Sequence, residues 1–168
     1  IETLLAALGQ LASAGRGVRA VIAGDGPQRQ VVEEFIAHGP GGGLVRMLGM
    51  VCDVPAVLSA ADVYVMPSLW EGWPLALGEA MSASLPAIGS DVPGIRDLIV
   101  PEHTGLLVER QDADALAGAI GRLVADGPMR ARLGAAGRRR IVDQFSIEQT
   151  VAAHERLYDD VAGYRRHG

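Results

Sequence analysis

The chain has one cysteine, Cys52, among 168 residues. A single thiol can form neither an intrachain disulfide framework nor a cysteine-based zinc site, so we expect a reducing compartment or indifference to redox state. Positive charge is also in deficit, because lysine and arginine together number 15 against 20 acidic residues, for a formal net charge of -5. This balance argues against a protein that coats nucleic acid, since such domains are usually basic.

Long apolar runs are missing as well. No uninterrupted stretch of the sequence approaches the roughly 18 residues that suggest a membrane span. The opening Ile1-Glu2-Thr3 lacks the basic and apolar regions of a signal peptide, so we expect a soluble, cytoplasmic domain. Because the first residue is isoleucine and not methionine, we also expect the chain to be part of a longer protein, with the missing piece upstream.

What is present is the composition of an ordinary globular domain. Hydrophobic residues make up 49% of the chain and charged residues 21%, which is far from the charge-rich composition of disordered segments. The length falls within the range of one domain, and at that size roughly 70% of the unfolded surface can be buried on folding. We therefore expect residues 1–168 to form a single domain with a real core.

Short apolar runs alternate with helical patterns along most of the chain. The runs predict strands at residues 18–23, 44–48, 61–66, 85–89 and 105–108. Helices are expected between them at 3–14, 27–38, 54–60 and 74–83, with a short one after 91–95. This alternation is typical of an α/β fold, a Rossmann-like doubly wound parallel sheet covered by helices on both faces.

Further helical patterns follow the last strand. The first of these helices is expected to end at Gly127-Pro128. Ser146-Ile147-Glu148-Gln149 is typical of a capping box that opens the last helix, because the serine hydroxyl and the glutamine amide can satisfy reciprocal N–H groups. The predicted domain therefore has a core sheet with its helices over about 1–109 and C-terminal helices over 110–168.

A pair of glutamates lies where such a fold binds ligands, at the carboxyl ends of the strands. Glu71 falls in a loop after a strand, and Glu79 lies on the following helix, about 7 Å along its axis from Pro74. Free N–H groups at a helix start favour phosphate, and flanking carboxylates can accept hydrogen bonds from sugar hydroxyls. Alone this spacing is weak evidence, because a solvated loop carboxylate and a solvated helix carboxylate give the same pattern.

Other segments strengthen the interpretation because they occur in a characteristic order. These segments are Gly24–Pro27, Leu48–Val51, Ala61–Ser68, Glu71–Leu75, Glu79–Met81, Leu85–Ala87, Asp91–Ile95, His103–Val108 and Phe145-Ser146. With them, nearly the whole chain closely resembles the C-terminal, donor-binding domain of family-four retaining glycosyltransferases, also called glycosyl transferases group 1. That family has the GT-B architecture, in which two Rossmann-like domains face each other across a cleft.

The resemblance implies roles for the matching positions. Glu71 corresponds to the first motif glutamate, near the donor sugar and the reacting centre, and is the expected catalytic residue. Glu79 corresponds to the second motif glutamate, which holds the ribose hydroxyls. The backbone that would face the sugar and diphosphate belongs to Gly72, Trp73, Pro74 and Leu75. Residues that would grip the base, or let the first loop approach the nucleotide, are Met50, Val51, Asp53, Gly24 and Gly26.

Simpler explanations stay open at several positions. Trp73 is equally well explained as a packing aromatic, and Gly24 and Gly26 as turn residues before a helix that Pro27 opens. Arg138-Arg139-Arg140 suits a solvated surface better than a phosphate site. Cys52, beside the presumed base pocket, is better explained as an inert small side chain.

The chain also departs from the family pattern. Pro74 stands where many relatives have glycine, Ser84 replaces a usual glycine, and Arg96-Asp97 replaces a usual Pro-Glu pair, which puts the donor preference in doubt. The family's basic loop, whose arginine and lysine neutralise the leaving diphosphate, would lie upstream of residue 1. The N-terminal acceptor domain is therefore absent from this chain by the same resemblance.

The resemblance implies a hexosyltransferase-type enzyme when the chain is joined to that missing domain. The chain would bind a nucleoside-diphosphate sugar for transfer to an acceptor hydroxyl with retention, while the fragment alone would bind nucleotide weakly and be inactive. No metal or other cofactor is expected, because basic side chains and a helix end would stabilise the leaving group. Nucleic acid is not an expected partner, and peripheral membrane contact is expected only through the missing domain. Alternatives are a non-catalytic nucleotide-sugar-binding module, a domain that has kept only the scaffold, and a fragment of a GT-B-type nucleotide-sugar epimerase.

Overall fold

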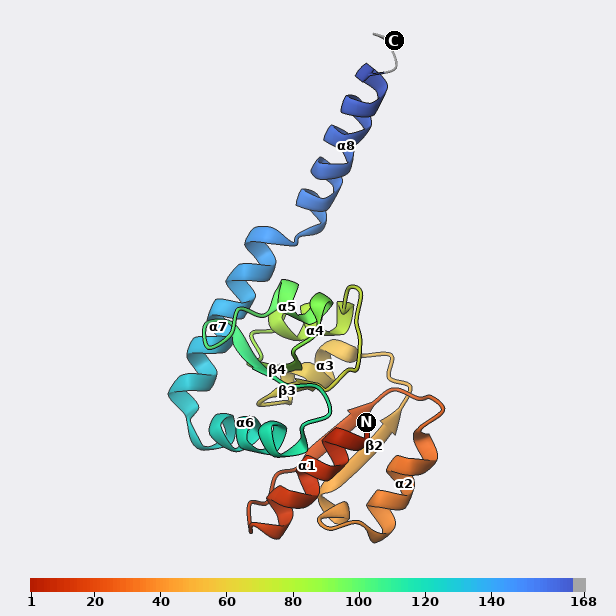
Figure 1. The fold of residues 1–168 in the computed structure, drawn as a ribbon, viewed down its shortest axis with the longest axis vertical. Helices are drawn as coiled ribbons and strands as arrows, with labels where there is room; N and C mark the ends of the chain where they lie inside the picture. The colour runs from red at the N-terminus through yellow and green to blue at the C-terminus, as the bar shows by residue number, and fades with distance from the viewer. Residues whose placement is uncertain (165–168) are drawn as a thin grey trace.

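The structure of the chain, a computed structural model, describes residues 1–164, so the last four residues of the predicted domain lie outside it. Strands and helices alternate first, as predicted (Figure 1): α1 (Glu2–Ser13), β1 (Ala20–Ala23), α2 (Arg29–His38), the 3-10 turn η1 (Gly42–Leu44), β2 (Val45–Gly49), α3 (Val54–Ser59), β3 (Tyr64–Met66), α4 (Leu75–Ser82), β4 (Ala87–Ser90), α5 (Pro93–Leu98) and β5 (Gly105–Val108). Helices alone follow: α6 (Ala113–Ala125), α7 (Gly127–Gln144) and α8 (Ile147–Tyr164).

The strands pair in parallel, which confirms the α/β fold class. β1 pairs with β2, and β4 lies between β3 and β5. The sequence predicts one continuous sheet, whereas the ladders of the described residues form one sheet of two strands and one of three. The strands predicted at 18–23 and 61–66 begin only at Ala20 and Tyr64. Val18 and Val63 nevertheless pack against the core, so their side chains keep the apolar pattern while their backbone lies outside the ladder.

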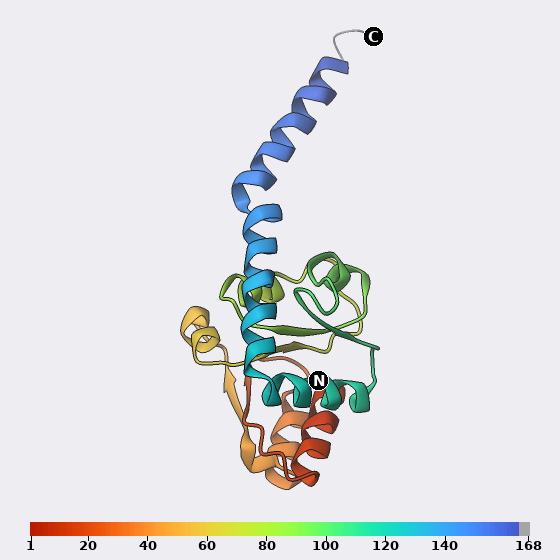
Figure 2. The same ribbon diagram turned by 90° about the vertical axis from the view of Figure 1, so that its left-hand side faces the viewer.

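The core lies on both faces of the central strand β4, which is buried along its whole length. Ile88 packs into one cluster with side chains of α1, α6 and the start of α7. Its neighbour Ala87 packs into a second cluster with side chains of α4 and α5. Successive strand residues face opposite sides of a sheet, so this one strand joins the two cores. Helices therefore cover both faces of the three-stranded sheet, as predicted (Figure 2).

Helix starts near Pro27 and Pro74 differ from the prediction by one or two residues, whereas α3, with Pro55 in its first turn, begins at Val54 as predicted. Pro27 is not the first helical residue, because α2 begins at Arg29, and Pro74 is the N-cap of α4. α6 ends at Ala125, just before Gly127-Pro128 as predicted, and these two residues themselves open α7. Asp126 explains this start, because its carboxylate accepts a hydrogen bond from the Met129 N–H at 2.8 Å and so caps the helix.

The last helix, α8, stands clear of the rest of the domain in both views (Figures 1 and 2). Ser146 Oγ accepts the Gln149 N–H at 3.3 Å, as the capping box predicts. The reciprocal bond is not the predicted one, because the Gln149 amide donates to the Asp143 carbonyl at 2.5 Å. That second bond ties the start of α8 back to the end of α7.

Candidate functional site

The loop after β3 carries the first of the two predicted glutamates. Ser68 Oγ donates a hydrogen bond to Glu71 Oε1 at 2.7 Å, and Glu71 is half-buried. Leu69 and Trp70 are exposed at the tip of this short turn. An ionised carboxylate accepts more than one hydrogen bond, so Glu71 is held by Ser68 and still has acceptor capacity for a ligand.

The second glutamate, Glu79, is exposed on α4, and both carboxylates act on Tyr64 of β3. Burial of the phenol, together with the charges of Glu79 and then Glu71, raises the pKa of Tyr64 to about 12. The cause is that a phenolate would be desolvated and would lie close to two negative charges. Both carboxylates therefore lie near enough to Tyr64 to oppose its ionisation.

The start of α4 lies between these two glutamates in the chain. Its N-cap, Pro74, makes no side-chain capping bond, and the Leu77 and Gly78 N–H groups donate to the Pro74 carbonyl at 3.1 and 3.2 Å. The N–H groups of Leu75 and Ala76 precede them and have no carbonyl partner within the helix. Leu75 is 70% exposed, so this end of the helix faces solvent. Such an end is suited to bind an anion.

A cavity of about 460 Å³ adjoins Glu79, between α3, α4 and the end of α7. Trp73, Leu75 and Glu79 of the predicted site contribute to its lining. The other lining residues are mostly apolar and are Val54, Pro55, Leu58, Gly78, Ser82, Ala83, Leu98, Ile141 and Phe145. Glu79 is the one ionisable side chain of this lining, so the cavity is an apolar space with a carboxylate on its wall.

The Glu71–Gly72 backbone rests directly on Gly94, near the start of α5. A Cβ atom added at Gly94 would lie 2.5 Å from the Gly72 carbonyl oxygen and 2.6 Å from that of Glu71. No side chain larger than hydrogen fits there without moving the loop. Gly94 belongs to Asp91–Ile95, one of the segments that carry the family resemblance, but the sequence predicts no role for Gly94 itself.

Trp73 packs against Phe145, the residue that ends α7. The two ring centroids are 5.2 Å apart with an interplanar angle of 56°, a tilted arrangement that aromatic pairs favour. Trp73 remains 48% exposed. Of the two explanations that the sequence left open for Trp73, packing is therefore realised, and the exposed part of the ring leaves sugar contact untested.

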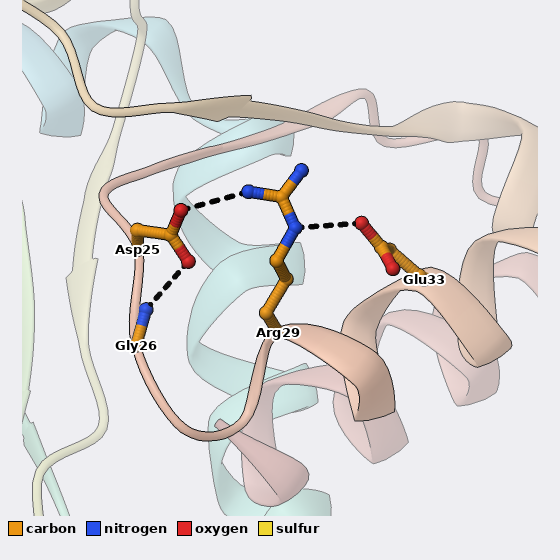
Figure 3. Close-up of polar contacts among 4 residues, drawn as sticks. All are labelled: Asp25, Gly26, Arg29 and Glu33. Carbon is orange, nitrogen blue, oxygen red and sulfur yellow. Dashed lines mark hydrogen bonds and ion pairs between the residues drawn. The ribbon is translucent and has the colours of Figure 1, made fainter.

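In the loop after β1, Asp25 bonds to both Gly26 and Arg29 (Figure 3). Gly24 has a φ of 118°, which favours glycine, and its N–H donates to the Gly49 carbonyl at 2.7 Å. Asp25 accepts hydrogen bonds from the Gly26 N–H and from Arg29, both at 2.8 Å, and these bonds lower the pKa of Asp25. Arg29 also donates to Glu33 at 2.7 Å. Turn geometry accounts for Gly24, whereas the Gly26 N–H already has an acceptor in Asp25, and nucleotide contact by either glycine stays a prediction.

The loop after β2 holds the residues predicted to grip the base. Met50 is 79% exposed and Val51 is half-buried. Asp53 caps α3, because its carboxylate accepts the Ala56 N–H at 3.0 Å. Cys52 is exposed in the same loop.

The predicted site residues thus fall into two groups. The segment from Glu71 to Glu79 brings together the two carboxylates, the helix start and the cavity wall. Gly24, Gly26, Met50, Val51 and Asp53 lie in loops of the two-stranded sheet, joined to each other by the Gly24–Gly49 bond. Within residues 1–164, no group of three or more His, Cys, Asp or Glu side chains is placed to hold a metal ion. In the same part of the chain, no helix is both long and apolar enough to cross a membrane.

Comparison with known proteins places the chain in a family. Residues 1–140 match the model of the family described as glycosyl transferases group 1. A relative from Escherichia coli, UDP-Gal:alpha-D-GlcNAc-diphosphoundecaprenol alpha-1,3-galactosyltransferase, is 39% identical over 115 residues, which is 68% of this chain and 30% of that protein. The 2-deoxystreptamine glucosyltransferase of Streptomyces kanamyceticus is 31% identical over 163 residues, 95% of this chain and 42% of that protein.

A solved structure agrees in fold over most of the chain. Sucrose-phosphate synthase from Thermosynechococcus elongatus matches with a TM-score of 0.85 and 33% identity, covering 97% of this chain and 42% of that one. The chain therefore spans less than half the length of these similar proteins. The family match covers most of the residues, and the order of motifs and the parallel α/β fold agree with it. The chain belongs to the family of glycosyl transferases group 1.

Proposed function

We propose that this chain is the donor-binding half of a retaining glycosyltransferase of hexosyltransferase type and binds a nucleoside-diphosphate sugar at the start of α4. The observation that carries the proposal is that Glu71, held by Ser68, and Glu79, on the wall of the apolar cavity, stand on either side of the solvent-facing helix start in the chain. The similar Escherichia coli protein is named for a UDP-galactose donor, which makes a uridine nucleotide the first choice for a test.

Each part of the site would hold a different part of the donor. The free N–H groups of Leu75 and Ala76 would accept the diphosphate, where the helix dipole favours negative charge. Glu79 would accept hydrogen bonds from the ribose hydroxyls, with the apolar cavity beside it. Glu71, held by Ser68, would face the donor sugar. This arrangement would orient the bond between C1 of the sugar and the phosphate.

The chemical demand is to stabilise the leaving diphosphate as that bond breaks and the sugar gains cationic character. The α4 start supplies part of this stabilisation, and we expect basic side chains outside this chain to supply the rest, without a metal ion. The acceptor hydroxyl would attack from the face of the leaving group, so that the anomeric configuration is retained. Because those basic side chains and the acceptor site lie outside the chain, we propose that residues 1–168 alone bind nucleotide weakly and do not turn over. We expect the enzyme to be cytoplasmic, with any membrane contact made through its other domain.

Isothermal titration of the chain with UDP, GDP and UDP-galactose tests the proposal. Charge-assisted hydrogen bonds contribute about 1.5–3 kcal/mol, so Glu79→Ala should lower the affinity for UDP about 10- to 100-fold. Glu71→Ala should lower the affinity for UDP-galactose more than that for UDP, because Glu71 faces the sugar. Glu34→Ala, at an exposed carboxylate of α2, is the control and should change neither affinity.

The same titrations define the contrary result. Failure of the unaltered chain to bind any of the three nucleotides, or an unchanged UDP affinity in Glu79→Ala, would overturn the proposed site. A coupled assay for released UDP tests the second part. Efficient transfer by the isolated chain would contradict the claim that it does not turn over.

A further inference from the structure

A row of three side chains links the candidate site to the end of α7. Trp73, in the loop that carries Glu71, packs on the Phe145 ring at 5.2 Å. The guanidinium of Arg140 lies over the same ring, 5.4 Å from its centroid. Phe145 is half-buried and packs against the core cluster that includes residues of α4 and α5. Its ring therefore contacts both a charged group and the tryptophan of the loop.

Arg140 itself is anchored to α5. Its guanidinium donates to the Leu98 carbonyl at 2.9 Å and to the Asp97 carbonyl at 2.8 Å, at the carboxyl end of that helix. Carbonyls at a helix end are unsatisfied and carry partial negative charge, so a cation is stabilised there. The position of the Phe145 ring is thus determined by packing inside the domain.

Phe145 also occupies the joint between α7 and α8. It is the C-cap of α7, its N–H donates to the Ile141 carbonyl at 2.9 Å, and Ser146 beside it caps α8. Since α8 stands clear of the domain in Figures 1 and 2, this joint is where a change in its direction would reach the packed core. Trp73 is the side chain of the candidate site whose ring packs on this joint.

We propose that Phe145 is a positioning residue of the donor site, which acts through Trp73 and couples the joint between α7 and α8 to the loop that carries Glu71. This inference rests on the proposed function, because its readout is the binding of a nucleotide sugar. Removing the Phe145 ring would leave Trp73 without its packing partner, and Gly72 and Glu71 precede Trp73 directly in the chain. The loop would then sample other positions, and Glu71 would be less well aligned with the sugar.

A double-mutant cycle separates this action from direct contact with the ligand, since Phe145 also lines the cavity. UDP-galactose and UDP are titrated into the unaltered chain, Phe145→Ala, Trp73→Ala and the double variant. Phe145→Ala should lower the affinity for UDP-galactose by at least about fivefold and that for UDP by less than about twofold, because Glu71, the side chain of the displaced loop, would face the sugar. In the Trp73→Ala background, Phe145→Ala should have no further effect.

Two further variants keep the test independent of folding. Phe145→Tyr retains the ring and should restore binding, while Val142→Ala, at an exposed residue one turn earlier on α7, should leave it unchanged. In a Trp70→Phe background, the fluorescence of Trp73 should shift to longer wavelength on Phe145→Ala and return in Phe145→Tyr.

The outcomes distinguish the two proposals. If the unaltered chain binds UDP-galactose and Phe145→Ala binds it equally well, the inference is overturned and the proposed function stands. The inference is also overturned if Phe145→Ala lowers affinity to the same extent with and without Trp73, because Phe145 would then contact the ligand itself. If the unaltered chain binds no nucleotide, both the proposed function and this inference are overturned.

Discussion

Gly94→Ala should disturb the candidate site through sterics alone. The added Cβ would lie 2.5 Å from the Gly72 carbonyl oxygen, and ordinary contact begins at 3.4 Å, so the loop must retreat by about 0.9 Å. Both nearest atoms belong to the backbone, so no side chain can rotate away. Overpacking of this kind costs about 1–3 kcal/mol, more than the roughly 1 kcal/mol that alanine gains over glycine in a helix.

The effect on binding follows from the same displacement. Moving Glu71 by about that distance would break its hydrogen bond to the sugar, which costs about 1.5–3 kcal/mol, so we expect the affinity for UDP-galactose to fall at least about tenfold. Urea unfolding gives the change in stability, and isothermal titration, at a temperature where the variant is folded, gives the change in affinity.

Two other glycines provide matched controls. An added Cβ at Gly118, on α6, meets nothing within 4 Å, so Gly118→Ala should stabilise the chain by roughly 0.5–1 kcal/mol without altering binding. An added Cβ at Gly134, on α7, would lie 2.0 Å from the Ser84 carbonyl oxygen, so Gly134→Ala should destabilise at least as much as Gly94→Ala. Gly134→Ala should nevertheless bind normally while folded. If Gly94→Ala has the same unfolding free energy and the same affinity for UDP-galactose as the unaltered chain, the close approach of α5 to the loop does not position the site.

Two further predictions concern the surroundings of the site. The pKa of Tyr64 is raised to about 12 in the folded chain against about 10 when unfolded, so the folded state holds this proton more tightly. As the pH rises between those values, the unaltered chain should lose up to about 2–3 kcal/mol of unfolding free energy, and Tyr64→Phe should not. Urea titrations across that range measure this loss. An equal loss in both proteins would refute the raised pKa of Tyr64. Arg140→Ala removes two hydrogen bonds to α5 and should destabilise by about 1–2 kcal/mol, whereas Arg139→Ala, exposed on the same turn, should change stability by less than about 0.5 kcal/mol. Equal urea midpoints for these two arginine variants would show that the α5 bonds contribute nothing.

The sequence predicts well those elements whose signal is local. β5 has the predicted bounds, Gly105–Val108, because an apolar run between turn residues leaves little freedom. The strand predicted at 61–66 is too long, since an apolar residue that packs from irregular backbone, such as Val63, leaves the same pattern as one in a ladder. Asp126 was overlooked as a helix cap, although its capping role is itself a local signal.

Contacts between distant segments are what the sequence could not supply. Gly94 under the Glu71 loop and Phe145 behind Trp73 depend on how α5 and α7 pack, and local periodicity carries no information on either. Arg140, predicted with its neighbours to be a solvated residue, instead bonds two carbonyls at the end of α5.

Asp53, predicted to grip the base, has its carboxylate engaged as the cap of α3. The assigned ligand contacts, which rest on the family resemblance, stay predictions.

The most direct test of the central claim is a crystal structure of the chain soaked with UDP-galactose. We predict that the diphosphate lies within about 3 Å of the Leu75 and Ala76 nitrogens, the ribose hydroxyls at the Glu79 carboxylate, and the galactose beside Glu71. A nucleotide bound with its diphosphate away from the start of α4, or with both glutamates beyond hydrogen-bonding distance, would contradict it.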